Sequence, residues 1–134
     1  MIMNKIEAKI QDVIFSQGIV IVDLCTIDFN LSAMMIHVQE KPLWLKKNTK
    51  VSVVFKETEV SIGKNFSGQI SLRNRIPSII TEIEQGELMS VVWLKCGEFR
   101  FASAITTRSV VMMELKAGDT VTAFIKANEI SLMS

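Results

Sequence analysis

The sequence predicts a mostly β protein made of two small five-stranded barrels in tandem, and three observations lead to this fold class. Part of the chain recurs 70 residues later with its apolar pattern intact, which indicates that one unit has been duplicated. Most apolar residues lie in short runs that alternate with polar residues, as in strands. Both copies order these runs as five strands with a short helix after the third, the order of an oligonucleotide/oligosaccharide-binding-type barrel.

The first copy contains each of these strands in turn. Residues 6–13 alternate, a turn follows at Ser16-Gln17-Gly18, and residues 19–24 form a β-branched run. Residues 29–35 alternate as a third strand, and a stretch broken by Pro42 follows it. Residues 50–62 contain a one-residue shift at Lys56-Glu57, which predicts two short strands or a bulge.

The second copy follows the same order. Its predicted strands cover residues 79–84, 88–94, 99–105 and 121–132, and residues 110–115 are the predicted helical segment. A segment rich in glycine and polar residues separates the copies. We therefore expect a first domain over residues 1–63, a linker over residues 64–70 and a second domain over residues 71–134.

Composition limits the possible partners. Hydrophobic residues make up 49% of the chain, while each copy alone is small, so the copies should share a core and the chain should form oligomers. The net charge is +1, with acidic and basic residues mixed, which gives no broad field for nucleic acid or an anionic membrane. No apolar run is long enough to span a membrane, and the first residues lack the apolar core of a signal peptide. Cys25 and Cys96 fit no metal spacing and are interpreted as reduced thiols of a cytoplasmic protein.

No motif of catalysis is present. The single histidine, His37, has no serine, cysteine or carboxylate at a recognisable spacing, and no phosphate-binding glycine loop or zinc-protease motif occurs. The eight methionines include two adjacent pairs inside apolar stretches, so core filling accounts for them better than copper binding. We expect a protein that is not an enzyme and has no metal bound by side chains.

Three short polar segments of the second copy carry the candidate site. Ser71-Leu72-Arg73-Asn74 opens the copy with a hydroxyl and a guanidinium that an extended strand would project to one face. Thr106-Thr107-Arg108-Ser109 lies where the third strand meets the predicted helix, and Lys126-Ala127 lies near the end. These segments supply hydroxyl donors, backbone donors and cations without a carboxylate, which suits a small oxyanion that carries no proton.

Each segment also has a purely structural interpretation. Thr106 or Ser109 can cap a helix, Lys126 can protect a strand edge, and residues 71–74 can be ordinary linker. The first copy bears on this choice, because Arg73, Thr106 and Ser109 correspond there to Met3, Ile36 and Gln39. Caps needed only for folding should be present in both copies.

The combined pattern resembles the molybdenum-binding Mop domain. The resemblance rests on the three segments together with Leu115-Lys116-Ala117-Gly118-Asp119 and Ala123-Phe124-Ile125, and it extends more loosely over residues 4–62. The chain is thus similar to a tandem Mop protein, or molbindin, and to the C-terminal parts of the molybdate-responsive regulator and the molybdate transporter ATPase. The resemblance implies an oxyanion held by hydrogen bonds at interfaces between Mop units.

Carried onto this sequence, the resemblance implies the following oxyanion-binding residues: Ser71, Leu72 through its backbone, Arg73, Thr106, Ser109, Lys126 and Ala127. Lys56 marks a possible weaker site in the first copy. The ligand would be molybdate or tungstate, with no other cofactor, and a trimer is favoured over a dimer.

The expected function is cytoplasmic molybdate or tungstate binding for storage, buffering or homeostasis of molybdenum. Three alternatives stay open. The chain can be the ligand-sensing module of a regulator or transporter ATPase, a barrel that binds single-stranded nucleic acid, or a structural interaction module. The low aromatic content of 7% and the near-neutral charge disfavour nucleic acid.

Overall fold

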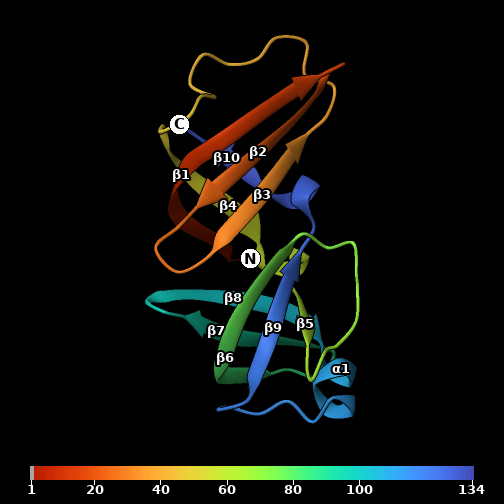
Figure 1. Cartoon of the computed structure of the whole chain (residues 1–134). Helices are drawn as coiled ribbons and strands as arrows, with labels where there is room; N and C mark the ends of the chain where they lie inside the picture. Colours follow the sequence, from red (N-terminus) through yellow and green to blue (C-terminus); the bar gives the residue numbers. More distant parts are fainter. Residues whose placement is uncertain (1) are drawn as a thin grey trace.

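The computed structural model describes residues 2–134, which form two five-stranded antiparallel sheets and one short α-helix. Figure 1 shows the two sheets as an upper and a lower barrel stacked along the long axis of the molecule. The strand order of the upper sheet is β10-β4-β1-β2-β3, and that of the lower sheet is β5-β9-β6-β7-β8. The predicted class, mostly β with two tandem five-stranded barrels, is confirmed.

The bounds of the elements follow the repeat. The upper sheet contains β1 (Met3–Ser16), β2 (Ile19–Cys25), β3 (Asn30–Met35), β4 (Lys50–Lys56) and β10 (Ser131–Met133). The lower sheet contains β5 (Ser61–Gly63), β6 (Asn74–Gln85), β7 (Met89–Cys96), β8 (Phe99–Thr106) and β9 (Thr120–Ile125). The helical elements are α1 (Thr107–Met112) and two 3-10 turns, η1 (Glu57–Glu59) and η2 (Ala127–Glu129).

The long first strand of each copy gives the barrel its curvature. The register of β1 with β2 shifts between Ile10 and Asp12, and that of β6 with β7 shifts between Ile80 and Glu82, at equivalent places in the repeat. A bulge bends a strand and increases its twist. Each bent strand can therefore pair with two neighbours that lie on different sides of the barrel.

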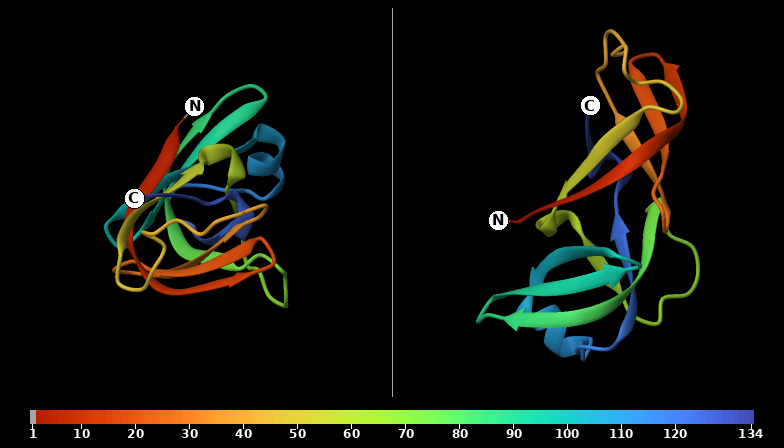
Figure 2. Two further views of the ribbon diagram at one scale, coloured as in Figure 1. Left: turned by 90° about the horizontal axis from the view of Figure 1, so that it is seen from above. Right: turned by 90° about the vertical axis from the view of Figure 1, so that its left-hand side faces the viewer.

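The last strand of each sheet comes from the other half of the chain. β5 pairs with β9 of the lower sheet through Ile62 and Ala123, and β10 pairs with β4 of the upper sheet through Leu132 and Val53. Figure 2 shows the C-terminal strand lying in the upper barrel among strands of the N-terminal half. The domain boundaries 1–63, 64–70 and 71–134 thus stay a prediction based on the repeat. Each hydrogen-bonded sheet contains strands from both halves of the chain.

The prediction of a helix after the third strand of both copies is wrong for the first copy. Only the second copy has one, α1, and residues 36–49 contain turns and bends without a helix. Thr106 caps α1 by accepting a hydrogen bond from the Ser109 N–H, whereas Ile36 at the equivalent place has no oxygen to offer. The left-handed backbone of His37, with φ of 57°, and Pro42 further oppose a helix there.

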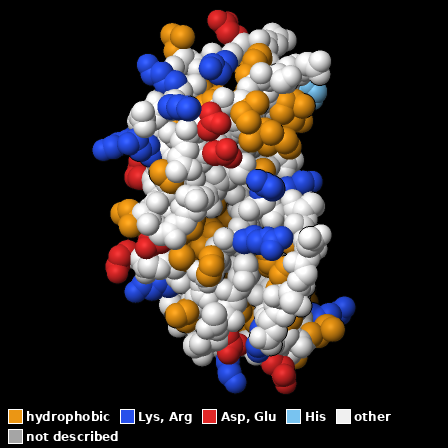
Figure 3. Space-filling model, viewed as in Figure 1, with side chains coloured by type: hydrophobic (Ala, Val, Ile, Leu, Met, Phe, Trp, Pro, Cys, Tyr) orange, Lys and Arg blue, Asp and Glu red, His pale blue; other side chains and the backbone are white. Residues whose placement is uncertain are grey.

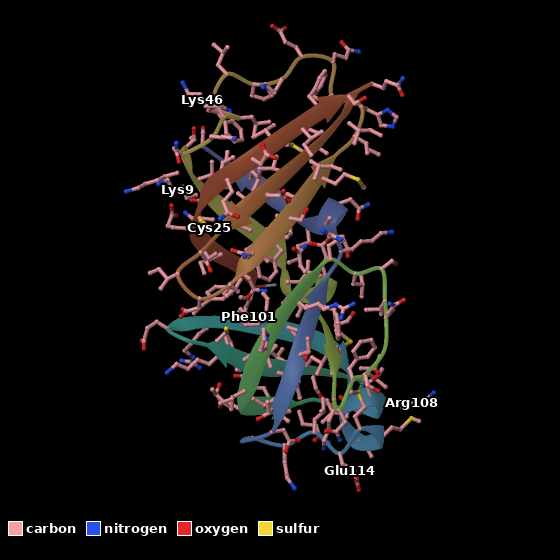
Figure 4. The ribbon with its side chains drawn as sticks, in the orientation of Figure 1. Lys9, Cys25, Lys46, Phe101, Arg108 and Glu114 are labelled. Atoms are coloured by element: carbon pink, nitrogen blue, oxygen red, sulfur yellow. The ribbon has the colours of Figure 1, made fainter. Side chains whose placement is uncertain are left out.

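The two barrels share one core, as expected for such small units. The ring of Phe99 in the lower sheet lies 5.7 Å from Phe29 and 6.4 Å from Phe55 of the upper sheet. Figure 4 labels the neighbouring Phe101 at the junction of the barrels. Buried apolar residues of both halves form a single contiguous cluster around these rings. Each barrel thus gains buried apolar area that it could not provide alone.

Two buried asparagines join the barrels reciprocally. The amide of Asn74 donates to the Ser32 carbonyl at 2.9 Å and accepts from the Ser32 N–H at 2.7 Å. Asn4, its counterpart in the repeat, makes the same pair of bonds with Ala102 at 2.9 and 2.8 Å. Each barrel thus uses an asparagine side chain to bind the backbone of the third strand of the other barrel. These bonds fix the relative position of the two barrels.

Candidate functional site

Five of the predicted site residues gather where β6 begins and β9 ends. The last backbone pair of these strands is Asn74 with Ile125, so residues 71–73 and 126–127 continue from adjacent strand ends. We call the residues of this place the basic half-site: Ser71, Leu72, Arg73, Lys126 and Ala127. Ser71, Arg73 and Lys126 are exposed, and Leu72 and Ala127 are half-buried. The segment 71–73 precedes β6 and is not the opening strand that the sequence predicts.

Arg75 holds this segment in an open conformation. Its guanidinium donates from Nη2 to the Ile70 carbonyl at 3.0 Å and from Nε to the Leu72 carbonyl at 3.4 Å. The same group lies 5.7 Å from the Phe66 ring centroid and 5.8 Å from that of Phe124, which fixes it by cation–π contact. The sequence interpretation did not assign Arg75 to the site, because only the structure shows which carbonyls it binds.

The backbone at the end of β9 is correspondingly free. Among residues 2–134, the Ala127 N–H donates to no acceptor, and the Leu72 carbonyl accepts from Arg75. The Lys126 and Arg73 side chains form no ion pair within the described residues. This half-site therefore offers a backbone donor and two cations that form no ion pair among residues 2–134.

A small polar hollow of about 280 Å³ borders the basic half-site. Arg73 and Asn74 line it on one side, and Asp23 and Ser32 of the upper barrel line it on the other. Asp23 contributes a carboxylate to the lining of this hollow, and it forms no ion pair with Arg73 in the described part of the chain. The hollow shows that the basic half-site is open to solvent.

Thr106 and Ser109 lie together at the start of α1, and we call them the hydroxyl half-site. Thr106 Oγ1 accepts from the Ser109 N–H at 3.2 Å and lies 3.0 Å from Ser109 Oγ. Capping is thus one role of Thr106, as its structural interpretation predicts. One of the two hydroxyl hydrogens forms the hydrogen bond between the two oxygens. The other hydroxyl hydrogen is available to donate to a ligand.

Contacts at both ends of α1 position the hydroxyl half-site. The buried Thr107 hydroxyl donates to the Gly86 carbonyl at 2.8 Å and lies 2.7 Å from Ser90 Oγ. At the other end, Lys64 Nζ donates to the Met113 and Glu114 carbonyls at 3.2 and 3.0 Å. A cation on the last carbonyls of a helix stabilises it.

Lys64 also forms an ion pair with Asp119, whose carboxylate lies 3.2 Å from Nζ. Desolvation alone would raise the pKa of Asp119, but hydrogen bonds from the Lys116 N–H and from Lys64, with the charges of both lysines, lower it overall. The linker, α1 and the turn before β9 are therefore held together around one ammonium group.

An apolar rim surrounds the hydroxyl half-site. Leu88, Met89, Val111 and Met112 are all exposed, and they line a hollow of about 710 Å³ together with Thr106, Arg108 and Glu87. Figure 4 shows Arg108 at the outer side of α1, at the lower end of the molecule. Exposed apolar side chains around polar ones are typical of a surface that another chain covers.

The chain by itself does not unite the two half-sites. Thr106 pairs with Met89, beyond the C-terminal end of β6, whereas Arg73 precedes the N-terminal end of the same strand. The 12 residues of β6 span roughly 40 Å along the curved strand. In Figure 1, α1 lies at the lower end of the molecule and β6 begins near its middle. An anion that contacts both half-sites must therefore bind between two copies.

The equivalents in the first half have different surroundings. Lys56 is exposed at the end of β4, as Lys126 is at the end of β9. Ile36 and Gln39, which correspond to the hydroxyl half-site, line a hollow with His37, Gln17 and Ile19. The upper right of Figure 3 shows an apolar patch beside the histidine. Ile19 and Ile36, which line the hollow with His37, are exposed. His37 is exposed.

Residues 2–134 contain no cluster of histidine, cysteine and carboxylate side chains that could hold a metal ion. Cys25 and Cys96 are free and partly buried. The described helix is too short and too polar to cross a membrane.

Comparison with known proteins relates the second half of the chain to a domain family and a longer part of it to curated relatives. The TOBE domain family matches residues 70–132. The molybdenum import ATP-binding protein ModC of Brucella abortus is 36% identical over 84 residues, which are 62% of this chain and 23% of that protein. The ModC proteins of Brucella suis and Brucella melitensis match equally. The chain thus spans about a quarter of the length of these curated relatives.

Two solved structures are similar as well. The cytoplasmic molybdate-binding protein ModG, with molybdate bound, has a TM-score of 0.92 and 25% identity, over 97% of this chain and 94% of that chain. A molybdate binding protein from Sporomusa ovata has a TM-score of 0.49 and 33% identity, over 50% of this chain and all of that one. The likeness to ModG includes both barrels and their arrangement. Residues 70–132 thus belong to the TOBE domain family, and the whole chain shares the two-barrel fold of ModG.

Proposed function

We propose that this protein binds molybdate, and tungstate with similar affinity, through the second half of the chain. The observation that carries the proposal is the basic half-site, in which Arg73, Lys126 and the Ala127 N–H have no acceptor among residues 2–134. The likeness to ModG, a cytoplasmic molybdate-binding protein, supports molybdate as the ligand and the cytoplasm as the location. The role is storage or buffering of the oxyanion without catalysis.

The binding site forms between two copies of the chain. Ser71, Leu72, Arg73, Lys126 and Ala127 of one copy donate to the anion, and Thr106 and Ser109 of a neighbouring copy complete its shell. The apolar rim at Leu88, Met89, Val111 and Met112 supports this arrangement, because it supplies area for a neighbour next to the hydroxyl half-site. A trimer is favoured over a dimer.

Titration calorimetry on the full chain with molybdate, tungstate, sulfate and phosphate tests the function. We expect binding of molybdate and tungstate, and failure of both to bind would refute the proposal. Sedimentation equilibrium tests the interface: a trimer is expected, and a monomer at micromolar concentration, with or without molybdate, would rule out a site shared between copies.

The match to ModC favours a second candidate function. The chain can act as the ligand-sensing module of a molybdenum transporter ATPase or of a regulator, with the same site. Co-purification with an ATP-binding subunit that depends on molybdate would support this role over free storage.

A further inference from the structure

The two halves differ in how far the backbone pairing extends at equivalent strand ends. In the second half, the pairing of β6 with β9 stops at Asn74 and Ile125. In the first half, the pairing of β1 with β4 continues to Met3 and Lys56, the positions of Arg73 and Lys126. The Glu57 N–H then donates to the Ile2 carbonyl at 3.2 Å. The backbone donor that is free at Ala127 is therefore already used at Glu57.

The side chain at this position differs as well. Glu57 corresponds to Ala127 in the repeat, and it is only 8% exposed. Within residues 2–134, its Oε2 is buried without a hydrogen-bond donor. A buried carboxylate oxygen without a donor is unfavourable for folding, so packing alone does not account for a glutamate here. The first half thus has a buried carboxyl group directly after the lysine that would otherwise attract an oxyanion.

We propose that Glu57 is a specificity-determining residue that excludes oxyanions from the first half, so that each chain carries a single basic half-site. The inference rests on the proposed function of the second half. Three differences act together in the first half: the carboxylate of Glu57, the bonded N–H of the same residue, and Met3 in place of Arg73. Repulsion between like charges at a partly desolvated place is much stronger than in water. Lys56 is then the one basic residue of the three equivalent positions 3, 56 and 57, and it directly precedes the buried carboxyl group of Glu57.

Calorimetry of the whole chain gives the first test, which is stoichiometry. We expect one molybdate per chain. Two molybdates per chain with equal affinity would overturn the inference while the proposed function stands. Absence of binding by the unaltered chain would overturn the proposed function itself, and this inference with it.

Exchange of the distinguishing residue tests the charge directly. Ala127→Glu gives the second half the carboxylate of the first, and we expect molybdate affinity to fall at least 100-fold. Ala127→Gln is the matched control, with the same size and no charge, and should retain clearly more affinity. An equal loss in both variants would show that bulk, and not charge, excludes the anion, and would overturn the role assigned to Glu57.

The reverse exchange asks whether Glu57 is the barrier in the first half. Met3→Arg combined with Glu57→Ala should add a weaker second binding event per chain, whereas Met3→Arg alone should add none. No gain in the double variant, or an equal gain in both, would overturn the inference. Circular dichroism and sedimentation of every variant confirm that the fold and the oligomer are kept.

Discussion

At the scale of single residues, neighbouring basic side chains have opposite roles. Arg75 is engaged by two carbonyls and two aromatic rings, so it shapes the site. Arg73 and Lys126 are exposed and without an ion pair in the described part of the chain, so they are available to an anion. Charge alone does not distinguish these residues in the sequence; their partners in the fold do.

Removal of either available cation should weaken molybdate binding. We expect Lys126→Ala and Arg73→Ala each to reduce the binding free energy by about 2–5 kcal/mol, because an anion enclosed at an interface loses a charged partner. Lys56→Ala is the matched control in the first half and should change the affinity little. Calorimetry that finds unchanged affinity in both second-half variants would contradict the site.

Selectivity among anions should follow the proton count of the ligand. Phosphate at neutral pH carries at least one proton, which would meet mainly hydroxyl, amide and cationic donors, and an unpaired group costs about 1–3 kcal/mol. We therefore expect molybdate and tungstate to bind similarly, sulfate more weakly because it is smaller, and phosphate weakest. Competition titrations measure this order.

Asp23 provides the internal check on that order, since it lines the hollow next to Arg73 and could accept a proton. If phosphate displaces molybdate at comparable concentration, the same titration on Asp23→Asn should abolish the displacement. Persistent displacement in this variant would remove the chemical basis of the predicted order.

At the scale of elements, α1 shows what a short sequence motif can and cannot predict. Thr106 and Ser109 predict a capped helix, and the cap is present. The corresponding residues Ile36 and Gln39 carry no such cap, and the helix is absent there, although the strand order of the two copies is the same. Apolar periodicity thus predicts the strands of both copies. Local hydrogen bonding determines whether the segment between the third and fourth strands forms a helix.

The Lys64–Asp119 pair should make the stability around α1 depend on pH. A carboxyl whose pKa is lowered in the folded state stabilises the fold above its unfolded pKa, and this contribution is lost as the pH falls through the folded pKa. We expect Asp119→Asn to remove part of the loss of melting temperature that the unaltered chain shows as the pH falls from about 5 to 3. Thermal unfolding at a series of pH values measures this difference.

Lys64→Met serves as the companion variant, because it removes the ammonium group and keeps most of the apolar stem. It should lower the melting temperature at neutral pH and weaken molybdate binding through the displaced hydroxyl half-site. Identical pH profiles for the unaltered chain and for Asp119→Asn would contradict the role of the pair.

At the scale of the whole molecule, the interface between the barrels depends on the two asparagines that bridge them. Asn74→Ala and Asn4→Ala each leave a backbone N–H and carbonyl of the opposite barrel without partners, so we expect a loss of unfolding free energy of about 1–3 kcal/mol in either variant. Because Asn74 adjoins Arg73, only Asn74→Ala should also reduce molybdate affinity. Chemical denaturation and calorimetry separate the two effects, and equal affinities would show that the half-site does not depend on this bridge.

The sequence predicts the strands and the duplicated unit because alternation is a local signal, and its short polar motifs indicate candidate residues for a second-half site that stay a prediction. It does not predict which barrel takes the strand after each 3-10 turn, because Ser61–Gly63 and Ser131–Met133 are equally suited to either sheet. Nor does it indicate that Arg75 opens the backbone at Leu72, or that Thr106 lies far from Arg73. Those features depend on tertiary pairing that no single segment encodes.

The exchange of β5 and β10 between the sheets has a consequence for biosynthesis. During translation, the upper sheet lacks its edge strand until residues 131–133 have been made, since β4 pairs with β10 and not with the strand that directly follows it. A nascent chain that ends before this point exposes the unpaired edge of β4, which is a template for pairing with another nascent chain. The upper sheet can therefore be completed only after residues 131–133 have left the ribosome, although most of its strands are made first.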